Sequence, residues 1–112
     1  MKKSRSGNYL DKKPVRNGKL RWSDEDGKIT LEIENTGVWN RIFQKLLKKP
    51  RVTYIHLDEM GSFIWPLLDG DKDISEIGKA VENQFGDKAN PLYERLAKYF
   101  RILESYNFIT LK

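Results

Sequence analysis

The stretch VTYIHLDEMGSFIWPLLDG, residues 52–70, decides the fold, because a strand pattern in it runs directly into a helix start. Residues 52–57 are rich in β-branched and aromatic side chains, which suit a pleated sheet. Asp58 can accept a hydrogen bond from the free N–H groups of a first helical turn, so we expect it to cap the helix that follows. This helix is expected to end at Asp69-Gly70, with a bend at Pro66, which lacks a backbone donor.

Two further helices are expected after residue 70. Asp73 and Glu76 have the spacing of a capping box, which marks the start of the second helix. Asn90 is expected to cap the third helix, with Pro91 at the first helical position. Residues 108–111 are expected to pack back on the domain as a short strand.

Two strands are expected before the quoted stretch. Ile29, Leu31 and Ile33 alternate with polar residues, the pattern of a sheet with one buried face. Residues 19–22 are expected to be the partner strand, joined to it by a turn at residues 23–28. Residues 36–49 carry apolar side chains at helical spacing and are expected to form an inserted helix. The predicted fold class is therefore α+β and winged-helix-like, with an N-terminal three-stranded antiparallel sheet followed by a three-helix bundle.

The chain has 112 residues, a length typical of one domain. Residues 1–19 hold seven of its 21 Lys and Arg but one of its 16 Asp and Glu, so the net charge of +5 belongs to the N-terminus. We therefore expect a flexible basic tail over residues 1–18 and a single domain over residues 19–112. No apolar run approaches the ~20 residues of a membrane span, and the lack of cysteine fits a reducing compartment, so a cytoplasmic protein is expected.

The sequence offers little for catalysis. His56 is the only histidine and cysteine is absent, so neither a His-based triad nor a thiolate or paired-His metal site can be assembled within one chain. A Gly-rich phosphate loop is also missing. We expect a protein that is not an enzyme, with no catalytic residue, no metal and no cofactor of its own.

In their order and spacing, these features resemble the PqqD family, small chaperones of peptide-modifying systems. The resemblance covers residues 52–110 well and the preceding hairpin loosely. The residues that carry it are Leu57-Asp58, Gly61, Ile64-Trp65, Leu68-Asp69-Gly70, Ile74, Glu76-Ile77, Phe85, Phe100, Leu103 and Phe108-Ile109. The insertion at residues 36–49 and Pro66 depart from the family pattern.

The resemblance implies a domain that binds the leader of a ribosomally made precursor peptide by β-strand addition. It would present that peptide to a radical S-adenosylmethionine maturase, in pyrroloquinoline quinone (PQQ) biosynthesis or a related peptide modification. The implied partners are the precursor peptide and the maturase, with neither a membrane nor a nucleic acid, and the protein would be a monomer or a strand-exchanged dimer.

The peptide-binding residues that follow from the resemblance lie on one strand and one helix. An exposed strand edge gives affinity through its backbone, and pockets beside it read alternate side chains of the guest. Arg95 and Lys98 would favour an acidic leader, and Tyr93 is a groove candidate because its hydroxyl prefers water. Taken singly, Leu96 and Leu103 are more simply core residues. The full set is Val52, Thr53, Tyr54, Ile55, His56, Leu57, Tyr93, Arg95, Leu96, Lys98, Tyr99 and Leu103.

Two alternatives stay open. A winged-helix nucleic-acid-binding protein would use the basic tail for phosphate contacts, although the expected third helix interrupts its basic positions with Glu94 and Glu104. A structural subunit would dock on a larger enzyme through Trp39 and Phe43.

Overall fold

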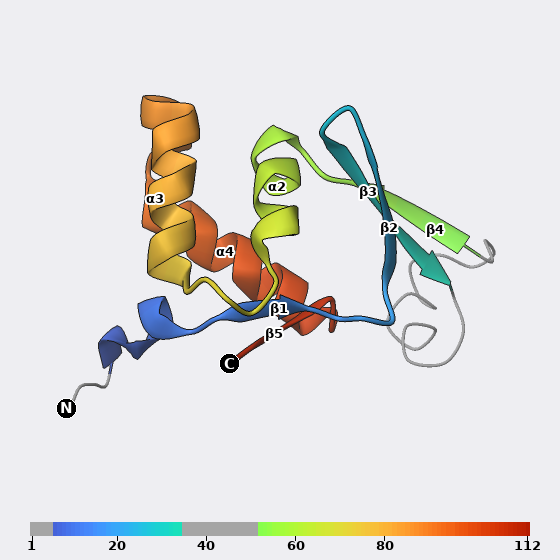
Figure 1. Cartoon of the computed structure of the whole chain (residues 1–112), viewed down its shortest axis with the longest axis horizontal. Helices are drawn as coiled ribbons and strands as arrows, with labels where there is room; N and C mark the ends of the chain where they lie inside the picture. Colours follow the sequence, from blue (N-terminus) through green and yellow to red (C-terminus); the bar gives the residue numbers. More distant parts are fainter. Residues whose placement is uncertain (1–5, 35–51) are drawn as a thin grey trace.

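The computed structural model describes residues 6–34 and 52–112. The helix expected at residues 36–49 lies outside the described residues. Figure 1 shows a sheet on one side of the molecule and the helices on the other. The elements in chain order are η1 (Ser6–Asp11), β1 (Pro14–Arg16), β2 (Arg21–Glu25), β3 (Lys28–Glu34), β4 (Val52–His56), α2 (Glu59–Ile64), η2 (Trp65–Leu67), α3 (Ile74–Phe85), η3 (Gly86–Ala89), α4 (Leu92–Ser105) and β5 (Ile109–Leu111).

Strands β2, β3 and β4 form a three-stranded antiparallel sheet in that order. The turn between β2 and β3 consists of Asp26 and Gly27 alone, with φ angles of 55° and 82°. Positive φ at both central residues is the signature of the tight hairpin turn whose twist matches its strands. The expected strand at residues 19–22 and turn at residues 23–28 were therefore placed too early, because exposed acidic residues extend β2 as far as Glu25.

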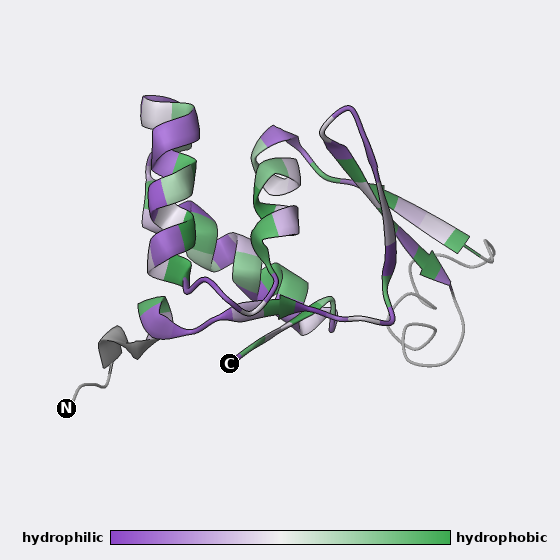
Figure 2. Cartoon of the chain, in the orientation of Figure 1, coloured by the Kyte–Doolittle hydropathy of each residue, from purple (hydrophilic) through white to green (hydrophobic). Residues whose placement is uncertain are grey.

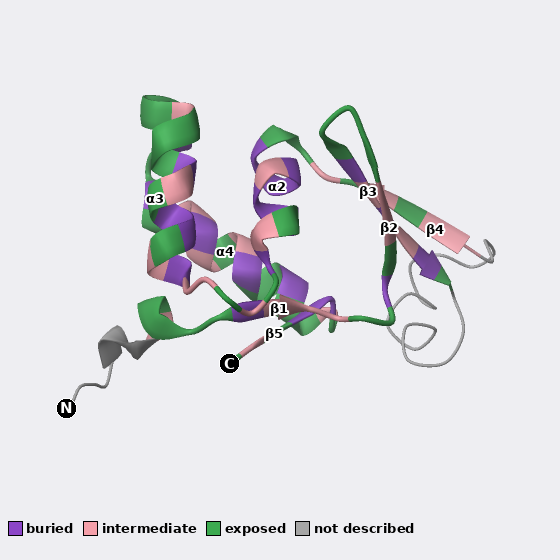
Figure 3. Ribbon diagram, viewed as in Figure 1, coloured by how far each residue is buried: buried purple, intermediate pink, exposed green. Residues whose placement is uncertain are grey.

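The inner face of the sheet packs on the helices. Ile29, Leu31 and Ile33 are fully buried, which confirms the alternation seen in the sequence. They join a core in which Trp65 and Phe100 are the largest fully buried side chains. Hydrophobic positions in Figure 2 and buried positions in Figure 3 coincide on β3 and on the facing sides of α2, α3 and α4.

Helix α2 begins as expected, since the Asp58 carboxylate accepts a 2.7 Å hydrogen bond from the Gly61 N–H. It does not continue as one α-helix to Asp69. The α-helix ends at Ile64 and a 3-10 turn follows, with Pro66 in its first turn, because proline supplies no donor for a further α-helical bond.

Both later helices are present, and one of the two predicted caps is confirmed. Asp73 and Glu76 form the expected capping box of α3. Asn90 does not cap α4. The 3-10 turn η3 occupies the preceding residues, so the Asn90 N–H donates to Asp87, and Pro91 is the N-cap of α4 with no side-chain hydrogen bond.

The N-terminal segment is built into the fold further than the sequence indicated. β1 pairs antiparallel with β5, with Val15 opposite Thr110 (Figure 1). The Arg16 guanidinium also donates 3.0 Å hydrogen bonds to the carbonyls of Trp65 and Pro66, at the end of α2 and in η2. The flexible tail expected over residues 1–18 therefore cannot include residues 14–16, whereas the short strand expected at residues 108–111 is confirmed.

The predicted fold class is confirmed as α+β, a three-stranded antiparallel sheet followed by three helices. Among the described residues, no helix has the length and apolar character needed to cross a membrane.

Candidate functional site

One edge of strand β4 lacks a partner strand among the described residues, because β4 pairs only with β3 there. The Leu57 N–H donates to the Ile29 carbonyl at 3.0 Å, which sets the direction of the backbone groups along β4. In an antiparallel ladder these directions alternate, so Thr53, Ile55 and Leu57 face β3. The N–H and C=O groups that point outward belong to Val52, Tyr54 and His56.

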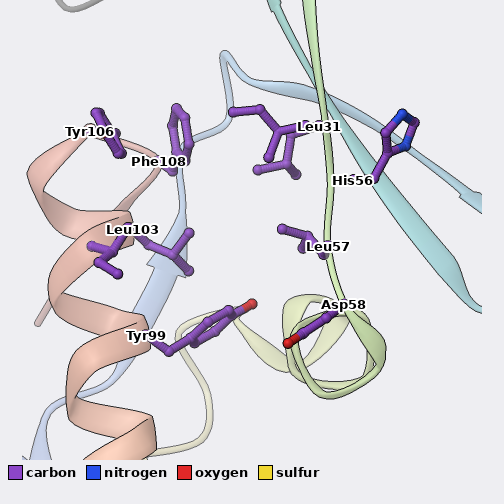
Figure 4. A pocket seen from close by; sticks show the side chains of 10 residues that line it. Leu31, His56, Leu57, Asp58, Tyr99, Leu103, Tyr106 and Phe108 are labelled. Atoms are coloured by element: carbon purple, nitrogen blue, oxygen red, sulfur yellow. The ribbon is translucent and has the colours of Figure 1, made fainter.

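The side chains of β4 divide between the two faces of the sheet. Ile55 and Leu57 are partly buried and pack against the core. Tyr54 is 59% exposed on the opposite face, and the His56 ring lies there too, with Nδ1 3.0 Å from the Thr30 hydroxyl. In Figure 4 the His56 side chain accordingly points away from the space between strand and helix.

An apolar hollow of about 360 Å³ separates β4 from α4. Figure 4 shows Tyr99 and Leu103 of α4 and the C-cap residue Tyr106 on one side of it and Leu57 on the other. The residues that line it are Leu31, Ile55, His56, Leu57, Asp58, Tyr99, Ile102, Leu103, Tyr106 and Phe108. We call the unpartnered edge of β4 together with this hollow the β4–α4 groove.

A second hollow of about 350 Å³ adjoins the first, and Asp58, Tyr99 and Ile102 line both. Its remaining lining residues are Met60, Gly61, Arg95 and Lys98, so it is charged where the first hollow is apolar.

Tyr99 forms a fixed wall between the two hollows. Its hydroxyl donates a 3.0 Å hydrogen bond to the Gly61 carbonyl, and its ring lies so close to Gly61 that an added Cβ would stand 3.2 Å from it. Burial of the phenol, with a smaller contribution from the negative charge of Asp58, raises the pKa of Tyr99 above its ordinary value of 10.0. The ring therefore stays neutral and anchored at ordinary pH.

The structure brings together most of the residues expected from the sequence. Ile55, His56, Leu57, Tyr99 and Leu103 line the apolar hollow, and Arg95 and Lys98 line the charged one. Val52, Thr53 and Tyr54 lie on the same strand.

Two expected residues lie elsewhere. Leu96 is fully buried in the core. Tyr93 packs over Gly78 of α3, where an added Cβ would meet its ring at 3.0 Å, so its exposed side is away from the groove. Both residues point toward α3 because they lie on a different side of α4 from Tyr99 and Ile102.

Sequence reasoning missed five lining residues: Leu31, Asp58, Ile102, Tyr106 and Phe108. The signal was present along α4 and its C-cap, where Tyr99, Ile102 and Tyr106 recur at helical spacing beside the core stripe. Ile102 is 46% exposed, so this second stripe faces the groove rather than the core. No group of three His, Cys, Asp or Glu side chains that could hold a metal ion occurs in the described part of the chain.

Comparison with known proteins identifies the family of the chain. The family model described as coenzyme PQQ synthesis protein D (PqqD) matches residues 45–109, which is more than half of the chain. No curated protein and no solved structure gives a significant match. The matched segment contains β4, α2, α3 and α4, and hence nearly all of the β4–α4 groove. The chain belongs to the PqqD family.

Proposed function

We propose that this protein is a non-catalytic chaperone that binds the leader of a ribosomally made precursor peptide. The leader adds as a strand to the outer edge of β4, and the complex is presented to a radical S-adenosylmethionine maturase. The observation that carries this proposal is that the outward backbone edge of β4, at Val52, Tyr54 and His56, ends at an apolar hollow that His56 helps to line.

The two parts of the groove supply affinity and selectivity separately. Outward N–H and C=O groups bind any extended chain, because they recognise backbone rather than sequence. Every second side chain of the added strand would point toward α4. One Leu, Ile or Phe side chain placed in the hollow would contribute about 1.5–3 kcal/mol to the free energy of binding. The hollow therefore selects the register in which the leader pairs with β4.

Family membership supports the choice of guest. The family is described as coenzyme PQQ synthesis protein D, which makes the PQQ precursor peptide the first leader to test. Nucleic-acid binding is the weaker candidate, because α4 exposes Glu94 and Glu104 beside its basic residues, and a phosphate-binding helix is more uniformly positive.

An NMR titration of isotope-labelled protein with overlapping leader fragments from precursor genes near its own tests the proposal. We expect shifts concentrated in Val52–His56 and in residues 99–108. A matched pair of variants tests the role of the hollow. Ile102→Gln should weaken binding of the leader about tenfold, whereas Leu10→Gln, at another exposed apolar residue, should leave the binding unchanged. Leader fragments that leave β4 unshifted, with salt-dependent binding to duplex DNA instead, would contradict it.

A further inference from the structure

The charged hollow continues the apolar one along α4. Arg95 and Lys98 line the charged hollow only, and neither forms a salt bridge with any other residue that the structure describes. The Arg95 guanidinium donates a 2.8 Å hydrogen bond to the Lys88 carbonyl of η3. Two cations are thus placed next to the groove without a carboxylate partner.

Asp58, the one acid that lines this hollow, carries a single negative charge against the two positive charges of Arg95 and Lys98. The Asp58 Oδ1 atom already accepts the 2.7 Å hydrogen bond from the Gly61 N–H as the cap of α2. The hollow therefore keeps an excess of positive charge in a partly enclosed place, where an acidic side chain of a guest would form charge-assisted hydrogen bonds.

The residues of α4 that line one hollow only indicate how far apart the two hollows lie. Lys98 lines the charged hollow and Leu103 the apolar one, and they are five residues apart, a rise of about 7.5 Å along the helix. Two residues of an extended strand cover about 7 Å, and their side chains point to the same face. One guest strand can therefore place side chains i and i+2 in the two hollows at once.

The order of the two side chains follows from the direction of the strands. The charged hollow lies beyond the C-terminal end of β4, next to Met60 and Gly61, whereas Ile55 lines the apolar one. All pairs in this sheet are antiparallel, and a guest that follows them runs opposite to β4. Its N-terminal residues then lie at the charged hollow.

Resting on the strand addition proposed above, we propose that the guest segment carries Asp or Glu two residues before the apolar side chain that it buries. The acid binds Arg95 and Lys98, and the apolar residue occupies the hollow between Leu57 and Leu103. This pattern, acid-any-apolar, defines the class of leader that the protein accepts.

Selection of binders from a random peptide library by the full-length protein tests this inference. We expect enriched peptides to contain Asp or Glu two positions before Leu, Ile, Val or Phe. Selection with Lys98→Gln should lose the acidic preference and keep the apolar one, whereas Lys79→Gln, the same change on α3, should select the original pattern. Replacing the acid of one enriched peptide by its amide should weaken binding to the wild type about fivefold and to Lys98→Gln much less.

The outcomes separate this inference from the function on which it rests. Enriched peptides that shift β4 in NMR spectra but lack the acid would overturn the inference and leave strand addition standing. An acid placed after the apolar residue would overturn the antiparallel order. Failure to enrich any peptide that contacts β4 would count against strand addition itself.

Discussion

The hydroxyl of Tyr99 donates a 3.0 Å hydrogen bond to the backbone carbonyl of Gly61, and this contact joins α4 to α2 between the two hollows of the groove. The Gly61 carbonyl also accepts the N–H of Trp65 within α2, so it keeps one partner if the phenol is removed. The contact thus positions a side chain that a guest peptide would touch. Its removal should destabilise the fold only slightly.

The first prediction concerns Tyr99→Phe at neutral pH. Because Gly61 stays paired, the free energy of unfolding should fall by only about 0.5–1.5 kcal/mol, the usual contribution of one hydrogen bond. Urea denaturation followed by circular dichroism measures it. Tyr54→Phe, which removes a hydroxyl from an exposed side chain, is the matched control and should change stability less.

The same variant has a predicted pH dependence. The pKa of Tyr99 is raised in the folded state above 10.0, mainly by burial, so folding keeps the phenol protonated. The stability that this group contributes is complete below the pKa of the unfolded chain and is lost as the pH rises through the folded value. Above pH 10.0 the wild type should therefore lose stability more steeply than Tyr99→Phe. Parallel alkaline slopes would show that Tyr99 ionises freely in the fold.

A second prediction concerns Ser62, which joins α2 to the sheet. Its hydroxyl accepts the Ile29 N–H at 3.0 Å and lies 3.3 Å from the Leu57 carbonyl, to which it donates. Ser62→Ala leaves the buried Ile29 donor without a partner, which should cost about 1–3 kcal/mol in the free energy of unfolding. Ser105→Ala, at an exposed hydroxyl near the end of α4, should cost less than about 0.5 kcal/mol in the same denaturation experiment.

The elements that the sequence predicted well are those with local signals. Asp58 capping α2 and the box of Asp73 and Glu76 depend on residues three positions apart. The alternation of Ile29, Leu31 and Ile33 likewise lies within one strand. The pairing of β1 with β5 could not be predicted in this way, because each strand has three residues and the partners lie at opposite ends of the chain.

The groove was predicted in part for a related reason. Helix α4 has an apolar stripe for the core and a second one for the groove, and their periodicity is the same. Tyr99 and Leu103 were assigned to the groove, but so was Tyr93, which lies over Gly78 of α3. Only the packing of α3 and of the sheet against α4 decides which stripe faces which partner.

A third prediction separates the two edges of β4. Tyr54→Pro removes an N–H that points outward and leaves the ladder with β3 intact, so stability should change little while leader binding falls at least tenfold. Ile55→Pro removes an N–H that faces β3 and should destabilise the fold. Tyr54→Ala, which loses the exposed ring but keeps the donor, is the matched control and should bind the leader nearly as the wild type does. Equal binding by Tyr54→Pro and the wild type, measured by calorimetry, would argue against strand addition at this edge.

The fourth prediction tests whether the segment before β2 belongs to the domain. Arg16 donates to the carbonyls of Trp65 and Pro66 at 3.0 Å each, and its guanidinium lies 5.3 Å from the centre of the Trp22 ring. Hydrogen bonds from a charged donor are stronger than neutral ones, so Arg16→Gln should lower the free energy of unfolding by about 1.5–3 kcal/mol.

The matched control for that variant is Arg21→Gln. Arg21 forms ion pairs of 3.9 and 3.6 Å with Glu32 and Glu34 on the exposed face of the sheet, and such pairs contribute about 0–1 kcal/mol. Both variants remove one positive charge, so a difference between them reports the backbone contacts of Arg16 rather than net charge. Equal stabilities of Arg16→Gln and Arg21→Gln in urea denaturation would mean that the backbone contacts of Arg16 do not stabilise the domain.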